Sequence, residues 1–526
     1  MSFRKAAIAL IALALSSPSL GQHWTDFVPL DPRTAESGRP YLTAPRHQLD
    51  DPVSQALLAD TPFQKYLTYQ RYRVVVGDAP PYEGGFVHGP GHHISAIAAL
   101  VFDPHGTPYA TLKSGDTRLA RALRAEPYVA TSGIAGRWDK KGASAADIVL
   151  GELAEEIGGH PIEGTFRRLG ESLSPTMPFE STESDEYFSA AVKIDASPYG
   201  DGGQMEVVGL IGPVFLDPTA AIMAMDSGEI SDAARARTMF GRAWDAIGYL
   251  PDLGMYVHDF PELENRFDTL GLGPANDPRE LAAASAIPPD RAPDGTLASK
   301  VNSVKVDSIH RIPLGEDLEM VDARIQHAAW DGAKQVSLPP VFSSQYLRTD
   351  YDRAKVAVYY LDPENGPMVE MTPQARPALA FAPGEPKVVR RDLRDLKVAK
   401  LAKNRERPFI VPDRATPLLQ TDWVRQAVGD ACAGLPHRLA QHSAASSGQS
   451  DLFYWSYSCR IDPPEASDRK NFFTLADAIR LCRSGHGDAQ SEATLLRLAT
   501  HLDWLPQLGM ARSTVYLRTN PVGQGR

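Results

Sequence analysis

The chain has 526 residues, more than one domain usually holds, and its 43% hydrophobic and 23% charged residues are enough to build buried cores. Its 54 basic and 65 acidic residues give a formal net charge of −11. This acidic balance disfavours nucleic acid as a partner, because a phosphate backbone binds basic surfaces.

The N-terminus has the pattern of a secretory signal peptide. Arg4 and Lys5 precede an apolar stretch (6–15), and small residues at 19–21 offer a cleavage site. We therefore expect residues 1–21 to be removed and the protein to be periplasmic or secreted. The alternative is a mis-called start codon ahead of a cytoplasmic protein. No later segment is long and apolar enough to predict a membrane span.

The following segments alternate between strand and helix patterns. Residues 94–102 (ISAIAALVF) are β-rich and lead into the turn DPHG, and residues 186–195 (EYFSAAVKID) alternate as a strand does. Residues 144–159 have helical periodicity, and residues 218–228 and 232–250 also indicate helices. This mixture predicts α/β layers around a mixed sheet.

The first of these helices carries three glutamates, Glu152, Glu155 and Glu156. Ser144 is its expected N-cap and Gly158 its expected C-terminal stop. Residues three and four apart on a helix are neighbours, so the carboxylates share a face and repel one another. A divalent cation such as Mg²⁺, which takes oxygen ligands, would cancel that repulsion. The alternative is a solvated acidic helix face. The expected apolar side comprises Ala146, Val149, Leu150, Leu153 and Ile157.

Residues 136–159, GRWDKKGASAADIVLGELAEEIGG, resemble the Nudix box. That signature consists of G, five residues, E, seven residues, and R-E-U-x-E-E-x-G-U, in which U is apolar. The three glutamates and Gly158 fall on box positions. Gly136 fits the opening glycine if the loop carries one extra residue.

Two flanking segments narrow the resemblance to the ADP-ribose pyrophosphatase-like branch of the Nudix hydrolase family. Residues 174–192 resemble that branch's S-P-G…S-D-E segment, and residues 205–233 resemble its closing strand and helix. The chain departs from the family where Gly151 replaces the box arginine and Ala143 replaces the first box glutamate. In the family those two residues pair and brace the loop, so a structural pair is lost while the ligand carboxylates remain.

The resemblance implies metal-dependent hydrolysis of a diphosphate bond in a nucleoside diphosphate linked to another moiety, with ADP-ribose-like small molecules favoured. The three helix glutamates would bind Mg²⁺ or Mn²⁺, which polarises the diphosphate and lowers the pKa of an attacking water. Glu186 is the first candidate for the catalytic base and Glu183 the second. Arg137, which can meet a phosphate, and Asp201 are candidates for substrate binding. The alternatives are polar loop residues and a surface arginine.

The two halves of the chain resemble each other. VFDPHGTP (101–108) recurs as YLDPENGP (360–367), and YLPDLGM (249–255) recurs as WLPQLGM (504–510). Three weaker matches between them keep the same order. We therefore expect a tandem duplication that forms two Nudix-like α/β/α sandwich domains with mixed sheets. The alternative is two unrelated α/β domains with chance matches.

The expected organisation has three parts after the signal peptide. A Nudix hydrolase-like domain with an N-terminal extension covers residues 22–270, a Pro/Ala-rich linker covers 271–300, and a degenerate second domain covers 301–520. We expect the two domains to pair within the chain, as copies of a dimer would.

The second copy lacks most of the acidic residues. It has Ala427, Asp430 and Ala431 in place of the three helix glutamates, and Phe453 in place of Glu186 if the copies are aligned on their shared Ile-Asp. One carboxylate cannot hold a hydrated Mg²⁺ as three can. We therefore expect an enzyme whose first domain alone is active.

Two further readings stay open. The chain is alternatively a catalytically weak or inactive Nudix-fold protein that binds a nucleotide or acts as a scaffold, or an enzyme of another class, because this fold also hosts an isomerase of isoprenoid diphosphates. The three cysteines, Cys432, Cys459 and Cys482, match no disulfide framework or metal spacing. We expect them to be buried apolar thiols.

Overall fold

The computed structural model describes most of both halves of the chain. The described residues are 27–29, 68–74, 82–88, 93–116, 130–137, 142–170, 174–175, 183–194, 213–230, 232–282, 301–313, 318–330, 335–337, 341–348, 351–375, 389–399, 416–428, 432–440, 443–444 and 452–519. They form a mixed α/β structure in which both large sheets contain parallel and antiparallel strand pairs.

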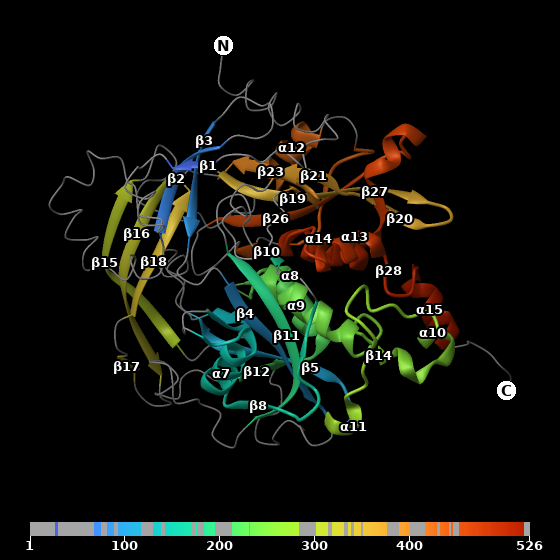
Figure 1. Ribbon diagram of the computed structural model, residues 1–526, viewed down its shortest axis with the longest axis horizontal. Helices are drawn as coiled ribbons and strands as arrows, with labels where there is room; N and C mark the ends of the chain where they lie inside the picture. The colour runs from blue at the N-terminus through green and yellow to red at the C-terminus, as the bar shows by residue number, and fades with distance from the viewer. Residues whose placement is uncertain are drawn as a thin grey trace, which may run out of the picture.

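The first large sheet lies in the N-terminal half (Figure 1). Its central strands β4 (His93–Phe102) and β11 (Ser184–Ile194) run parallel, whereas β5 (Pro108–Asp116) and β7 (Ile134–Arg137) pair antiparallel with β4. With β12 (Pro213–Leu216), the strand order is β10-β11-β4-β5-β12. The shorter strands are β6 (Ala130–Ser132), β8 (Gly159–Pro161), β9 (Arg167–Arg168) and β10 (Ser174–Pro175).

One edge of β4 changes partner along its length. Its first half pairs with β7, from Ile94 opposite Arg137, and its second half pairs with β5, from Ala99 opposite Thr111. Lys113 therefore lies two residues past Thr111, the last β5 residue that pairs with β4. The sheet forks at this point.

Helices cover both faces of this sheet. α7 (Ala145–Ile157) packs on one face, and α8 (Pro218–Ser227) and α9 (Ala233–Ala246) pack on the other. The strands alternate accordingly: Ile97 and Phe188 pack with α7, whereas their neighbours Ala96 and Tyr187 pack with α9. Alternate residues in each strand therefore face α7 on one side of the sheet and α8 and α9 on the other.

Local sequence sets the ends of α7. Ser144 accepts a hydrogen bond from the Asp147 amide at 3.1 Å, and the Asp147 carboxylate accepts one from the Ser144 amide at 2.9 Å, which completes a capping box. Gly158 ends the helix with φ of 61°. Both predicted ends are confirmed. On the apolar side, Val149, Leu153 and Ile157 are buried, but Ala146 and Leu150 are only half-buried.

The second large sheet, in the C-terminal half, has the same strand order. β19 (Tyr351–Asp362) and β26 (Phe453–Arg460) form its parallel pair, and β20 (Gly366–Glu370) and β23 (Arg394–Ala399) pair antiparallel with β19. With β27 (Phe472–Thr474), the order is β24-β26-β19-β20-β27. The shorter strands are β24 (His437–Arg438) and β25 (Ser443–Ala444).

The helices of the second half are also distributed over two faces. α12 (Thr416–Val428) packs on one face, and α13 (Leu475–Arg483) and α14 (Ala489–His501) pack on the other. α14 packs against α9, so four helices lie between the two sheets (Figure 1).

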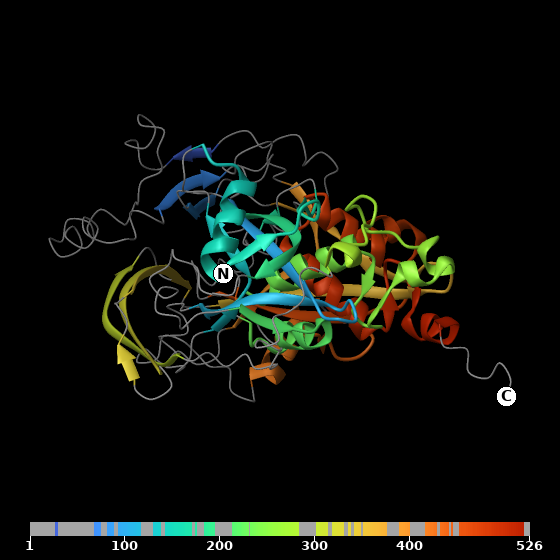
Figure 2. The ribbon, with the colours of Figure 1, turned by 90° about the horizontal axis from the view of Figure 1, so that it is seen from below.

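Smaller elements complete the fold. Figure 2 shows that β15 to β18 curve like half a barrel beside the larger sheets. The bounds are β1 (Phe27–Pro29), β2 (Thr68–Val74), β3 (Tyr82–His88), β13 (Tyr249–Leu250), β14 (Met255–Tyr256), η2 (Val257–Asp259), α10 (Pro261–Glu264), α11 (Arg279–Ala282), β15 (Val301–Pro313), β16 (Leu318–Trp330), β17 (Gln335–Ser337), β18 (Val341–Arg348), β21 (Thr372–Ala375), β22 (Val389–Asp392), η6 (Ala466–Asn471), β28 (Trp504–Leu505), β29 (Met510–Ala511) and α15 (Arg512–Thr519). Among the described residues no helix has the length and apolar character that a bilayer crossing requires.

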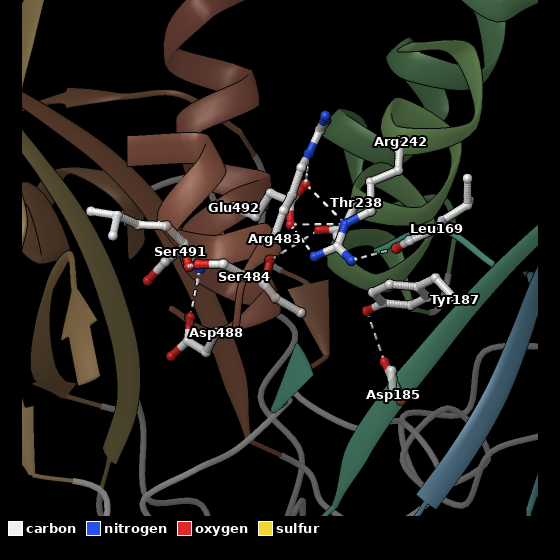
Figure 3. Close-up of polar contacts among 12 residues, drawn as sticks. Leu169, Asp185, Tyr187, Thr238, Arg242, Arg483, Ser484, Asp488, Ser491 and Glu492 are labelled. Carbon is white, nitrogen blue, oxygen red and sulfur yellow. Dashed lines mark hydrogen bonds and ion pairs between the residues drawn. The ribbon is translucent and has the colours of Figure 1, made fainter. Parts of the chain in front are cut away.

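Buried ion pairs join α9 to the second half. Arg242 of α9 binds Glu492 of α14 through Nη2 and Oε2 at 2.6 Å. Arg483 of α13 binds the same carboxylate at 2.9 Å and Asp245 of α9 at 2.7 Å. Burial opposes ionisation of Glu492, but Arg242 and Arg483 outweigh it and hold the pKa of that carboxyl below its usual value. Figure 3 shows Arg242, Arg483 and Glu492 meeting between the helices of the two halves.

The segment predicted as a linker begins within packed structure. Leu272 and Ala282 are buried in the same core as α9, and Arg279 of α11 pairs with Asp259 at 2.8 Å. Residues 283–300 lie outside the described residues.

The cysteine prediction is wrong for two of the three residues. Cys432 and Cys459 form a disulfide with Cα atoms 5.3 Å apart, whereas Cys482 is a free buried thiol, as expected. Cys432 follows α12 and Cys459 lies near the end of β26, so the fold joins residues that are 27 positions apart. Sequence spacing alone gave no indication of this contact.

Candidate functional site

Glu156 is the most buried of the three glutamates on α7. Its carboxylate forms an ion pair with Nζ of Lys113 on β5. Leu112 packs on the α9 side, so Lys113, its neighbour in the strand, faces α7. Glu152 and Glu155 are half-buried. The helix therefore presents its carboxylates beside a cation that belongs to the chain itself.

Glu152 lies against the backbone of β7 at Gly136. A Cβ atom built at position 136 would collide with the Glu152 carboxylate, at a distance that real Cβ atoms do not adopt. Ile134, two residues earlier on the same strand, packs in the core with α7. Glycine at position 136 therefore allows the carboxylate to approach the strand closely, which explains why this position is not occupied by another residue.

Glu186 shares that face of the sheet. It stands opposite Ser95 of β4, and Ser95 stands opposite Gly136, so all three positions point toward α7. Oε1 of Glu186 pairs with Nε of Arg168 at 2.5 Å. Arg168 stands opposite Phe188, and its side chain is 44% exposed. The first base candidate and the helix carboxylates therefore lie on the same face of the sheet.

Glu183 belongs to a separate cluster that involves α9. Its carboxylate is 3.1 Å from Nη2 of Arg235 and 3.8 Å from Nη2 of Arg137. Arg235 also binds Asp185 through Nε at 2.8 Å and Asp232 through Nη1 at 3.0 Å. One guanidinium thus ties the start of β11 to α9. Glu183 therefore contacts Arg235 and Arg137, on the face of the sheet opposite to α7.

Asp185 is fully buried on the face of the sheet opposite to α7. Burial raises its pKa to about 6, although the Arg235 guanidinium favours the charged form. Tyr187 donates a hydrogen bond to the Asp185 carboxylate at 2.9 Å. Because Asp185 and Tyr187 point away from α7, this perturbed carboxyl supports the strand and does not face the helix carboxylates.

Sequence reasoning missed three cations. Lys113, Arg168 and Arg235 all hold candidate or neighbouring carboxylates, yet no motif includes them. Lys113 offered a weak signal, because it is charged and follows apolar Leu112 in a β-rich stretch. The other two become significant only through contacts that the fold creates. Asp201, the remaining predicted residue, lies outside the described residues.

The chemistry of the donors fits a divalent cation. The donors on α7 are carboxylate oxygens, and Gly136 leaves room for one of them beside the strand. Within the described residues, no three or more His, Cys, Asp or Glu side chains converge on one point. Mg²⁺ commonly binds through one or two carboxylates together with waters and substrate phosphates. Glu152 and Glu156 fit that mode.

The corresponding face of the second sheet holds an apolar cluster. Asp103 and Asp362 close equivalent turns by accepting amide hydrogen bonds, and they lie eight positions after Ser95 and Ala354 (103 − 95 = 362 − 354 = 8). Ala354 stands opposite Trp455, so Trp455 and not Phe453 occupies the place of Glu186. The alignment on Ile-Asp missed this because β26 is shorter before that pair.

The chain was also compared with known proteins. It matches no family model and no curated protein. Among solved structures, the crystal structure of an ADP compounds hydrolase is similar over 34% of this chain and 85% of that chain, with 13% sequence identity and a TM-score of 0.25. A similarity at that level assigns neither fold nor activity, so function is argued from the residues of the site.

Proposed function

We propose that the N-terminal half is a metal-dependent hydrolase of diphosphate bonds in nucleoside diphosphates linked to another moiety, with ADP-ribose-like compounds favoured. One observation supports this most strongly: carboxylates of α7 and Glu186 of β11 share a face with Lys113 and Arg168. Carboxylates suit a hard divalent cation, and ammonium and guanidinium groups suit phosphate oxygens.

Each residue of the proposed site has a distinct role. A bound Mg²⁺ or Mn²⁺ would supply Lewis acidity toward the diphosphate and a lowered pKa of the attacking water. Glu152 and Glu156 would hold the ion, with Glu155 beside them on the same helix. Glu186 orients or deprotonates the water, and its ion pair with Arg168 holds the carboxylate in place on this face.

We further propose that the two halves are copies of one domain and that only the first retains the chemistry. The shared strand order, the matching aspartate turns and the sequence matches support a duplication. The contacts of α9 with α13 and α14 support pairing of the two copies within the chain. Trp455 in the place of Glu186 supports loss of catalysis in the second copy.

Export from the cytoplasm is also part of the proposal. The apolar leader supports a periplasmic or secreted protein. The disulfide between Cys432 and Cys459 supports the same assignment, because such bonds persist mainly in oxidising compartments. Mass spectrometry of the protein from its native cell tests this, and an intact leader in the cytosolic fraction would contradict it.

The activity is tested by a screen of diphosphate compounds. The full chain is incubated with Mg²⁺ or Mn²⁺ and a panel of nucleoside diphosphates linked to sugars, nucleosides or other groups, and released phosphomonoesters are measured. We expect cleavage of ADP-ribose-like compounds. Absence of turnover across the panel with both ions would contradict the proposed function.

One observation favours a rival function. Glu156 and Glu186 already have cationic partners of the chain itself, Lys113 and Arg168. A site neutralised in this way suits a protein that binds a nucleotide without hydrolysing it. Binding of ADP-ribose without release of a phosphomonoester would support this rival.

A further inference from the structure

Arg242 links the second half of the chain to the strands that carry Glu186. On one side its Nε and Nη2 atoms bind both oxygens of Glu492, at 2.6 to 3.1 Å. On the other side Nη1 donates a hydrogen bond to the carbonyl of Leu169 at 2.9 Å. The guanidinium also lies 5.0 Å from the centre of the Tyr187 ring. Figure 3 shows Arg242 between Glu492 and Leu169, with Tyr187 alongside.

Leu169 and Tyr187, which Arg242 contacts on this second side, are the chain neighbours of Arg168 and Glu186. Leu169 follows Arg168, and Tyr187 follows Glu186. The Leu169 amide donates to the Tyr187 carbonyl at 2.7 Å, so the two neighbours are also bonded to each other. Because adjacent side chains in a strand point to opposite faces, Arg242 holds this backbone from the face opposite to α7.

Arg242 itself is fixed by the second half. Glu492, its partner, is fully excluded from solvent and is held in turn by Arg483. Gly170 adopts φ of +110°, and a Cβ there would lie 3.0 Å from Nη1 of Arg242. A glycine at this position therefore keeps the space that the guanidinium needs.

We infer that Arg242, held by Glu492, is a positioning residue for the Arg168–Glu186 pair. The second half thus influences the reaction without contacting substrate. Its Glu492 holds Arg242, and Arg242 fixes the backbone next to Arg168 in β9 and next to Glu186 in β11. This inference rests on the proposed function for the role of Glu186. The contacts that carry it do not depend on that function.

Arg497 provides a matched control. It is as buried as Arg242 and also joins the two halves, through Nε to Asp226 at 2.7 Å and through Nη2 to the carbonyl of Met225. It contacts Ser456 at 2.8 Å within its own half. Asp226 and Met225 belong to α8, so these contacts fix α8 and not β9 or β11.

The experiment compares Glu492→Gln, Arg242→Lys and Arg497→Lys in the full chain. Two kinds of measurement are made: kcat and KM for ADP-ribose with Mg²⁺, and amide hydrogen exchange of peptides covering 165–170 and 184–190. Lysine retains the charge of Arg242 but cannot bridge Glu492 and Leu169 together. Glutamine retains the shape of Glu492 and removes its charge.

We expect Glu492→Gln and Arg242→Lys to lower kcat by about 10- to 100-fold with KM unchanged, because small misplacements of a catalytic group are costly. Exchange should increase in both peptides. Arg497→Lys should lower the melting temperature while leaving kcat, KM and the exchange of these peptides unchanged.

The outcomes separate the inference from the proposed function. Equal effects of Arg242→Lys and Arg497→Lys on kcat and on exchange would overturn the inference. If the wild type shows no turnover, the proposed function fails, and unchanged exchange at 165–170 and 184–190 in Arg242→Lys would then overturn the positioning contact as well. If Glu492→Gln does not fold, Arg242→Lys decides alone.

Discussion

The outer faces of the two large sheets have the same architecture and opposite chemistry. In the first half the face beneath α7 carries Glu156 with Lys113 and Glu186 with Arg168. In the second half the face beneath α12 holds an apolar cluster that includes the fully buried Trp455. The comparison shows that two sheets with the same strand order and helix layers can carry either a polar face or a packed apolar one.

The disulfide extends this comparison. In the first sheet Ala190 stands opposite Ala99. Val358 matches Ala99 in the second sheet, because the two residues are separated by the same offset as Asp362 and Asp103 (358 − 99 = 362 − 103 = 259). Cys459 stands opposite Val358 and therefore matches Ala190. Ala190 is part of the apolar core with α7. The second half thus has a covalent link where the first half has an apolar contact.

The largest expected effect concerns the polar face. Glu186→Gln removes the charge of the base candidate and keeps its shape, so we expect kcat to fall by about 10²- to 10⁴-fold. Glu163→Gln, at an exposed glutamate outside the site, is the control and should retain full turnover. Steady-state hydrolysis of ADP-ribose measures both. Equal activity of the two variants would contradict the assignment of Glu186.

A substitution in the apolar cluster beneath α12 should lower stability and leave turnover unchanged. Trp455→Ala leaves a cavity beneath α12, and we expect the free energy of unfolding to fall by about 3–5 kcal/mol. Turnover per folded molecule should not change, because Trp455 lies in the sheet of the second half, outside the proposed site. Urea denaturation together with kinetics checks this. A loss of turnover without a loss of stability would contradict the packing role of Trp455.

The disulfide is expected to have a smaller effect. It closes a separation of 27 residues, and reduction should lower the free energy of unfolding by about 2–4 kcal/mol. Denaturation curves with and without reductant measure the change. Cys482→Ala should retain the response to reductant, whereas the double variant Cys432→Ala and Cys459→Ala should not respond. A reductant response in the double variant would assign the effect to another cause.

The smallest expected effect is a pH dependence of stability at Asp185. Its pKa is about 6 in the folded protein and 3.8 for an ordinary aspartate, so the folded state holds the proton more tightly. The contribution of this group to stability therefore falls as the pH rises through that interval and is lost above it. The stability of wild type relative to Asp185→Asn should decline between those pH values. A difference that stays constant over this range would show that the carboxyl is not perturbed.

Local signals made α7 predictable. Ser144, Asp147 and Gly158 set its ends through contacts within a few residues, so the sequence contained the necessary information. The carboxylates of α7 and Glu186 could also be proposed from sequence, because the Nudix-like pattern names them. Their common face was not predictable in the same way, since it depends on the register of β4, β7 and β11.

The cations of the site were not predictable because their contacts join distant parts of the chain. Lys113 meets Glu156 across 43 positions, and Arg235 meets Asp185 across 50. Arg242 meets Glu492 across 250 positions. Residue type and spacing cannot distinguish such arginines and lysines from those on a solvated surface. Their roles follow from the packing of helices on sheets.

The central claim is that the α7 face of the first half binds a divalent cation and hydrolyses a diphosphate. The most direct test measures phosphomonoester release from ADP-ribose by chelator-stripped wild type and by Glu156→Gln, before and after Mg²⁺ is added. The account predicts no turnover without metal, recovery in the wild type on addition of Mg²⁺, and little recovery in the variant. Undiminished turnover by the wild type after exhaustive chelation would contradict it.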